Sequence, residues 1–189
     1  TSIEDLEVGK RIRCHYKAKV SQIGQFSQLG EANHSFIPLP YEPQPNGDFY
    51  FIMVDEENGK KKLIADRNIQ HMIPWDKLYN EGMTSEKGKL ILQTKQNKIY
   101  CTLPSGKGDS NDWDKYIANS HLLSTINWNW DAGAVSWTRS TKNEKIILRG
   151  AFYSADKLLL EGTINSSIIR NQEATRLRGF RPLINVFNY

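Results

Sequence analysis

The sequence is poor in cysteine, because a chain of 189 residues contains only Cys14 and Cys101. Two cysteines without a CxxC motif are too few for a disulfide-built scaffold. We expect two buried thiols that serve as small apolar side chains, and whether they pair is left open. The histidines are also few and lie singly, without the spacing of a metal-ligand motif, at His15, His34, His71 and His121. The sequence therefore predicts no bound transition metal.

Long apolar runs are missing as well. No run approaches the ~18 residues of a membrane helix, and the chain does not begin with the basic-then-apolar pattern of a signal peptide. We therefore predict no membrane insertion. Hydrophobic residues make up 39% of the chain and aromatic residues 11%, which is enough to build a globular core. The first residue is Thr rather than Met, and we expect the chain to be a C-terminal piece of a longer polypeptide.

The charge imbalance is small. Lys and Arg number 25 against 21 Asp and Glu, a net charge of +4 with a pI near 9.0. Binding to nucleic-acid phosphates requires a pronounced basic surface. The compact basic run at residues 60–62 directly follows Glu56 and Glu57, a mixture typical of a solvated turn. The sequence therefore predicts no nucleic-acid partner.

Catalytic motifs are absent too. The chain has no Gly-x-Ser-x-Gly, no His-Glu-x-x-His and no phosphate-binding loop. The loop carboxylates Asp109 and Asp112 are typical of helix caps. Together with Asn111 they offer oxygen ligands for Ca²⁺, which is the one cofactor that the sequence leaves open. We predict that the chain is not an enzyme.

Short strands dominate what the sequence contains. Residues 11–20 alternate between apolar and polar, the pattern of a half-buried strand. Four prolines in residues 38–47 predict an extended loop. Asn58-Gly59 predicts a tight hairpin between strands at 49–54 and 61–65. Short helices are predicted over 74–82 and 112–118. Further strands are expected at 90–92, 98–103, 128–130, 134–137, 145–148, 158–160 and 180–187.

The second half of the chain carries one signature in four pieces. They are Leu103-Pro104-Ser105 leading to Trp113-Asp114, then Trp128-Asn129-Trp130, then Arg149-Gly150, and then Gly179-Phe180-Arg181. In this order they resemble the C-type-lectin-like fold in its formylglycine-generating-enzyme branch, with its sulfatase-modifying-factor-like, phage receptor-binding and retroelement variable proteins. That branch reads L-P-T, W-E-W, R-G-G and G-F-R. The resemblance covers residues 73–186, and the chain departs from it in the longer gap at 106–111 and in Asn129, which replaces Glu.

The resemblance implies an α+β, C-type-lectin-like fold over residues 67–189, with mostly short antiparallel strands and two short helices. Residues 1–66 would form an N-terminal β-rich layer, either separate or part of the same domain. The copper-dependent enzymes of the branch use a cysteine pair late in the chain. No cysteine follows Cys101 here, so their activity does not carry over to this chain.

The resemblance also implies non-catalytic recognition of a host cell-surface glycan or surface protein, at the tip of a phage tail fibre or a related particle. The protein would then act on a virion or at a cell surface. Tryptophans 128 and 130 share one face of a strand, which favours the core. The expected ligand-binding residues are polar or aromatic neighbours, namely Asn127, Asn129, Asp131, Trp137, Arg139 and Tyr153. The alternatives are an assembly module that forms homo-oligomers such as trimers and, ranked last, a degenerate formylglycine-generating-type enzyme.

Overall fold

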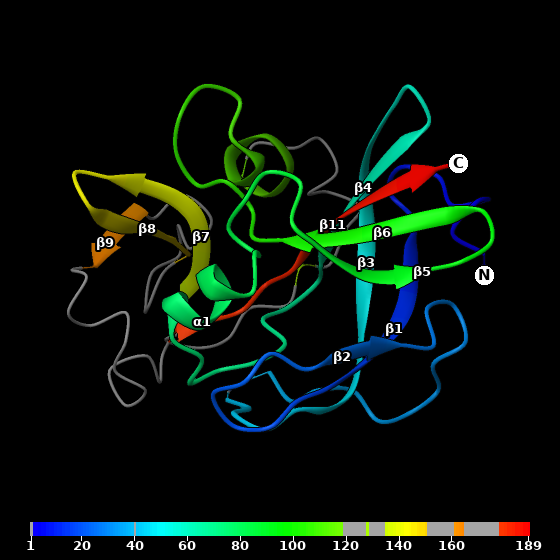
Figure 1. Cartoon of the computed structure of the whole chain (residues 1–189), viewed down its shortest axis with the longest axis horizontal. Coiled ribbons are helices and arrows are strands. Elements are labelled where there is room, and N and C mark those ends of the chain that lie inside the picture. The colour runs from blue at the N-terminus through cyan, green and yellow to red at the C-terminus, as the bar shows by residue number, and fades with distance from the viewer. Residues whose placement is uncertain (1, 40, 119–127, 129–134, 151–160, 165–177) are drawn as a thin grey trace.

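Seven antiparallel strands form the main sheet of the protein. The computed structural model describes residues 2–39, 41–118, 128, 135–150, 161–164 and 178–189. The sheet curls into a nearly closed barrel, with β2 and β5 as its edge strands (Figure 1). In spatial order its strands are β2 (Gln25–Ser27), β1 (Arg11–Lys17), β3 (Asn46–Glu57), β4 (Lys60–Ala65), β11 (Leu183–Asn188), β6 (Asn97–Thr102) and β5 (Lys89–Gln93).

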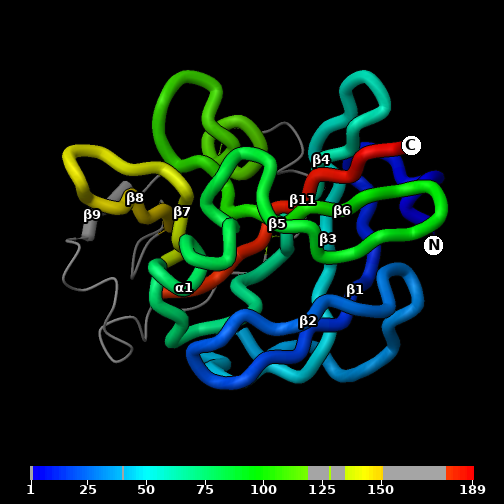
Figure 2. Tube along the Cα trace, viewed as in Figure 1, coloured from blue at the N-terminus to red at the C-terminus, as the bar shows by residue number. Residues whose placement is uncertain are grey.

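A smaller sheet lies beside this barrel, on the left in Figure 2. Its order is β10 (Arg178–Gly179), β7 (Val135–Lys142), β8 (Lys145–Arg149) and β9 (Glu161–Ile164). The described helices are α1 (Trp75–Asn80) and the π-helix η1 (Trp113–Ala118), with six residues each. No helix in the described part of the chain is long and apolar enough to cross a membrane.

The expected α+β, C-type-lectin-like fold is wrong, because the protein is mostly β, with a nearly closed barrel. Both helices lie where the sequence predicts them, and most of the predicted strands are present. What the sequence does not reveal is which strands pair. Strand β11 pairs with β4 on one side and with β6 on the other. Strands β1 to β4 and the C-terminal strand β11 therefore belong to one sheet.

The hairpin between β3 and β4 is confirmed at Asn58-Gly59. Both residues have positive φ, 52° at Asn58 and 75° at Gly59. A two-residue turn of this kind matches the twist of the strands that it joins. It sets Glu57 opposite Lys60 and Asp55 opposite Lys62. The turn therefore fixes a ladder of opposite charges at this end of the sheet.

Strand β3 is buried on both faces, which explains its continuous apolar run. Phe49, Phe51 and Met53 belong to the core inside the barrel. Ile52 and Val54 point to the other face and belong to a second cluster that includes residues of η1. The π-helix therefore packs on the outside of the barrel, where its polar residues reach the β3–β4 hairpin.

The two cysteines are fully buried, as the sequence predicts, and the structure answers the open question of their pairing, because both thiols are free. Burial raises the pKa of the Cys14 thiol to about 12 and also raises the pKa of Cys101. Thiols of this kind stay protonated at neutral pH and are poor nucleophiles.

Candidate functional site

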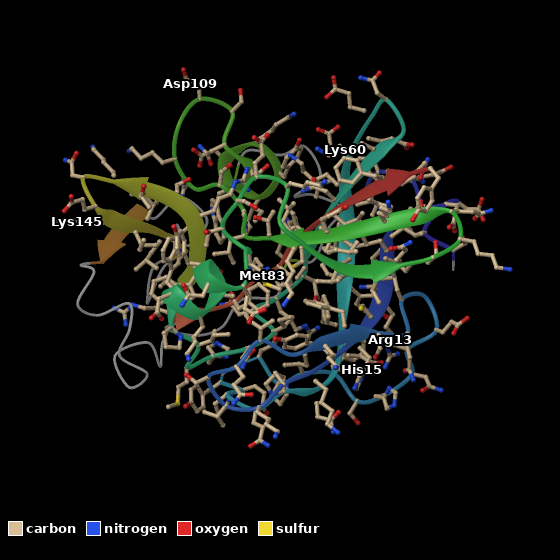
Figure 3. The ribbon with its side chains drawn as sticks, in the orientation of Figure 1. Arg13, His15, Lys60, Met83, Asp109 and Lys145 are labelled. Atoms are coloured by element: carbon tan, nitrogen blue, oxygen red, sulfur yellow. The ribbon has the colours of Figure 1, made fainter. Side chains whose placement is uncertain are left out.

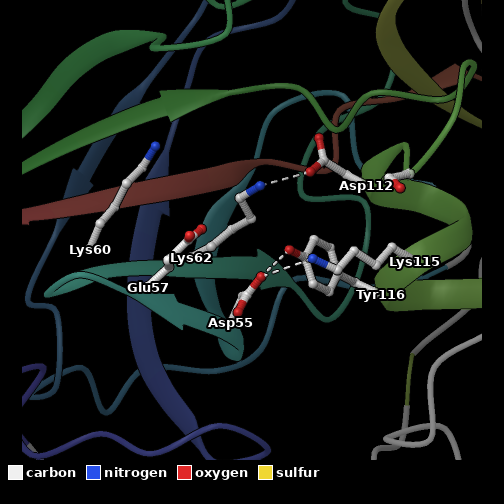
Figure 4. Close-up of a pocket in the computed structure, with 8 residues that line it drawn as sticks. Asp55, Glu57, Lys60, Lys62, Asp112, Lys115 and Tyr116 are labelled. Atoms are coloured by element: carbon white, nitrogen blue, oxygen red, sulfur yellow. Dashed lines mark hydrogen bonds and ion pairs between the residues drawn. The ribbon is translucent and has the colours of Figure 1, made fainter.

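A charged cavity of about 190 Å³ lies where η1 meets the β3–β4 hairpin (Figure 4). π-Helices are rare and often mark functional sites. Strand β3 also carries a register shift between Met53 and Asp55, and such bulges often re-aim side chains beside a site. The cavity is lined by Asp55, Glu57, Lys60, Lys62, Ser110, Asp112, Lys115 and Tyr116.

Strand alternation brings the hairpin charges to the cavity. Lys60 and Lys62 lie on the outer face of β4 and line it. Lys61 points the other way, where its ammonium donates to the carbonyl oxygens of Glu4 at 2.6 Å and Leu6 at 2.8 Å. The apparently uniform basic run therefore splits between two faces, and only two of its three lysines face the cavity.

Asp55 is bonded to two groups of the π-helix. Its Oδ2 accepts hydrogen bonds from the Tyr116 hydroxyl and from the Lys115 ammonium, the latter at 3.2 Å. Burial opposes ionisation of Asp55, but these two donors outweigh it and lower its pKa. Burial and the neighbouring carboxylate raise the pKa of Tyr116 to about 12. At neutral pH the cavity therefore presents an ionised Asp55 beside a neutral phenol.

Asp112 is the most heavily bonded carboxylate of the cavity. Its Oδ1 lies 3.0 Å from Lys62 Nζ, and its Oδ2 lies 2.8 Å from Arg139 Nη1. The backbone N–H and hydroxyl of Ser105 also donate to Oδ2, at 2.8 and 2.9 Å. Burial opposes its ionisation, but the charges of Arg139 and Lys62 outweigh this effect and lower its pKa. Asp112 therefore pins the loop at 105–112 to the barrel.

The same bonding argues against calcium at Asp109, Asn111 and Asp112. A carboxylate held between two cations attracts a third cation only weakly. The Asn111 amide donates to Gly108 O at 2.9 Å and Asp114 Oδ2 at 2.7 Å, and Asp109 is exposed. The three side chains thus have separate surroundings instead of converging on one point.

Acid should weaken the fold through Asp112. Because its pKa is lower in the folded chain, its contribution to stability is present above the usual value of 3.8 and is lost as the pH falls below it. We expect Asp112→Asn to lower the free energy of unfolding at pH 7 by about 1–3 kcal/mol. Urea titrations of both proteins should show this difference shrinking as the pH falls below 3.8. A difference that stays constant down to the acid transition would contradict the assignment.

Three polar groups at the cavity are available to a ligand. Among the described residues, the ion pairs at the cavity join Lys62 to Asp112 and Lys115 to Asp55, and none involves Lys60 or Glu57. The Lys60 ammonium lies over the Phe187 ring, 5.0 Å from its centre, which leaves its N–H groups able to donate to a ligand. The Asn185 amide oxygen is buried without a hydrogen-bond partner in the described part of the chain. Asn185 lines a neighbouring cavity of about 20 Å³, together with Lys60, Lys62, Asp112 and Arg139 among others. Lys60, Lys62 and Asp112 line both cavities. Together the two cavities present the Lys60 ammonium as a donor, and the Glu57 carboxylate and the Asn185 amide oxygen as acceptors.

The structure describes two of the six residues expected to bind a ligand. Trp137 is 0% exposed, and its indole Nε1 donates to Ile73 O at 3.0 Å, so it packs in the core instead of facing a ligand. Arg139 binds Asp112 and lines the small cavity, so it lies at the candidate site. The other four lie outside the described residues: Asn127, Asn129, Asp131 and Tyr153.

The sequence interpretation missed most of the cavity, because it assigned the hairpin charges to a solvated turn. A usable signal was present. A two-residue Asn-Gly turn dictates that Glu57 opposes Lys60, and that Asp55 opposes Lys62. Nothing in the sequence indicates that Tyr116 and Asn185 join them, because that depends on where η1 and β11 pack.

The arginines of the motif pieces are structural. Arg149 is buried and donates to Gly106 O at 2.9 Å and to Asp114 Oδ1 at 2.5 Å. Arg181 is fully buried, and its guanidinium donates to Ala65 O at 3.0 Å. Trp128 is buried against the π-helix, in the cluster that covers the outside of β3.

No protein-family model matches the chain, and neither a curated protein nor a solved structure matches it. The resemblance to the formylglycine-generating branch remains a prediction from the four motif pieces. A functional argument therefore depends on the chemistry of the cavity.

Proposed function

We propose that the protein is a non-catalytic binding module that recognises a cell-surface glycan through the cavity at η1. The observation that carries the proposal is the set of groups available there, namely the ammonium of Lys60, the carboxylate of Glu57 and the amide oxygen of Asn185. They lie beside paired charges that hold the cavity walls in place.

Sugar hydroxyls match this mixture of groups. A hydroxyl both donates and accepts, so adjacent hydroxyls of one ring can bond to a carboxylate and to an ammonium at the same time. A cavity of about 190 Å³ is smaller than the roughly 300–1,000 Å³ of a typical ligand pocket. It therefore suits one sugar ring or one substituent, with the rest of the glycan outside.

The two bonded carboxylates of the cavity, Asp55 and Asp112, do not suit the role of general acid in glycan hydrolysis. A general acid at neutral pH needs a raised pKa, so that it carries a proton to donate. The pKa values of Asp55 and Asp112 are both lowered, and each is bonded to cationic side chains. Binding without catalysis is the chemistry that these groups favour.

The biological setting that we propose is a bacterial host surface contacted by a phage tail fibre or a related particle. This part of the proposal depends on the four motif pieces and not on the cavity. Cell-wall fractions and a panel of soluble glycans are therefore the appropriate first probes.

Removing the available charges should weaken glycan binding. We expect Lys60→Ala/Glu57→Gln to raise the dissociation constant at least tenfold, because a hydrogen bond to a charged group contributes about 1.5–3 kcal/mol. The matched control is Lys145→Ala/Glu144→Gln, which removes the same two charges from the exposed β7–β8 turn. Lys60 and Lys145 lie in different parts of the molecule (Figure 3).

Pull-down on cell-wall fractions, followed by calorimetry with any glycan that binds, measures both variants. Saturable binding that the cavity variant loses and the control keeps would support the proposal. Saturable binding that both variants keep would place the ligand elsewhere on the molecule. No binding by the folded protein to any envelope fraction or glycan would reject glycan recognition.

A second candidate is the assembly module, and one observation favours it. The edge strands β2 and β5 leave a seam with cavities of about 300 and 550 Å³ beside it. Leu90 in this seam is 43% exposed, and partly buried Ile91 and Leu92 adjoin it. A stable trimer in light scattering, together with no glycan binding, would favour assembly.

A further inference from the structure

Two imidazoles and one carboxylate converge at the end of β3 opposite to the hairpin. The donor atoms of His15, His34 and Asp48 all lie within 4.8 Å of one another. Asp48 Oδ1 lies 2.8 Å from His15 Nδ1 and 3.4 Å from His34 Nδ1. Asp48 and Asp55 are seven residues apart on one strand, so this cluster lies roughly 20 Å from the charged cavity.

We propose that His15 Nδ1, His34 Nδ1 and Asp48 Oδ1 form a binding site for a divalent transition metal such as Zn²⁺. Zinc binds imidazole nitrogen and carboxylate oxygen at about 2.0–2.2 Å, so tetrahedral ligands lie about 3.3 Å apart. The two distances from Asp48 Oδ1 bracket this value. Imidazoles favour zinc over magnesium or calcium, which prefer ligand sets of oxygen alone.

The outer groups of the cluster orient its donors as a metal site requires. In the metal-free chain His15 Nδ1 donates to Asp48 Oδ1 at 2.8 Å, and a metal would take the place of that proton. His15 Nε2 lies 3.1 Å from Asn46 Oδ1, an acceptor for the Nε2 proton that a metal-bound imidazole keeps. Metal-binding histidines commonly donate their second ring nitrogen in this way. The other carboxylate oxygen, Asp48 Oδ2, accepts from Arg13 Nε at 2.6 Å and from the His34 backbone N–H at 2.7 Å. Asp48 Oδ1 is thereby aimed at both imidazoles.

The backbone also holds the loop of His34 against β3. The Asp48 N–H donates to Ser35 O, and the Ile37 N–H donates to Asp48 O, both at 2.9 Å. Gly47 permits this approach, since a Cβ there would lie 2.8 Å from Ser35 O. Arg13 packs over the Phe36 ring at 4.4 Å and donates to His34 O. His34 is therefore positioned although it belongs to a loop.

The three donors are buried to different degrees, which leaves the site accessible from one side. Asp48 is fully buried and His15 is 8% exposed, whereas the His34 side chain is 46% exposed. A metal held by these donors would keep its fourth position toward solvent, on the side of His34. The Arg13 charge beside Asp48 opposes a cation, so we expect micromolar affinity and not the tighter binding of a closed structural site.

Calorimetric titration of the metal-stripped full chain with ZnCl₂ tests the proposal. We expect one Zn²⁺ per chain, and visible absorption bands when Co²⁺ replaces it. His34→Ala should weaken binding at least tenfold and remove the bands. The matched control, Ser35→Ala, changes the neighbouring exposed side chain and keeps all three donors.

His34 is the variant of choice because its exposed side chain can be removed without opening the core. His15→Asn serves as the second variant, with circular dichroism to verify its fold. Binding that His34→Ala leaves unchanged would overturn the proposal, as would no binding at millimolar Zn²⁺ by the folded protein. The cluster would then be a structural hydrogen-bond network around Asp48.

Discussion

Trp137→Ala is expected to lower the free energy of unfolding by about 3–5 kcal/mol, the usual loss when a buried tryptophan is truncated. The side chain is among the largest fully buried ones and belongs to the main core. Its removal leaves a cavity and takes away the N–H that donates to Ile73 O. Urea denaturation followed by circular dichroism measures the loss.

Trp137→Phe is the graded control, because it keeps an aromatic ring and removes only the indole donor and part of the volume. We expect a loss clearly smaller than that of the alanine variant. An unchanged unfolding midpoint in Trp137→Ala would contradict the core assignment. If the assignment holds, Trp137→Ala changes the stability of the core and not a ligand contact, which makes Lys60 and Glu57 the better probes of the site.

Asp48→Ala is expected to lower the free energy of unfolding by about 3 kcal/mol. The carboxylate is fully buried and accepts from Arg13, His15 and the backbone of His34. Its removal leaves these donors without their acceptor. The Arg13 side chain is 27% exposed and can be partly solvated, so the loss should be in the lower part of the range for a broken buried pair.

Thermal and urea unfolding in the presence of EDTA measure this effect without any contribution from metal. Asp5→Ala is the matched control, since it removes an exposed carboxylate near the chain start and should change little. Equal stability of the two variants would show that the Asp48 cluster does not hold the loop at 34–37. Asp48→Ala should lose zinc binding as well as stability. His34→Ala should lose zinc binding with little loss of stability.

The pairing of the strands explains why local patterns predicted the elements but not the fold. Residues 58 and 59 specify their hairpin because an Asn-Gly turn with positive φ at both positions is a local property. The position of β11 between β4 and β6 is not local, since it joins segments more than 80 residues apart. The motif pieces lie in short segments, and the same short segments are compatible with more than one sheet order.

The candidate sites could also be predicted only in part, because some of their residues meet through local structure and others through the packing of distant segments. The charges of the cavity were visible in the sequence, and the hairpin register alone places Glu57 opposite Lys60. The cluster at Asp48 could not be predicted, because its two histidines lie far apart in the sequence and do not form a metal-ligand motif. His15 and Asp48 are cross-strand neighbours in the β1–β3 pair, 33 residues apart in sequence, and His34 joins them through a loop bonded to β3.

Sequence patterns alone predict the β-rich character, the two short helices, the hairpin at Asn58-Gly59 and the burial of both cysteines. These properties depend on alternation, turn chemistry and composition, which act over a few residues. Three further features depend on how distant segments pack: the sheet curls into a nearly closed barrel, Trp137 faces inward, and Asp48 meets two histidines. Alternation assigns side chains to two faces of a strand, whereas the packing of distant strands decides which face is buried and which residues meet.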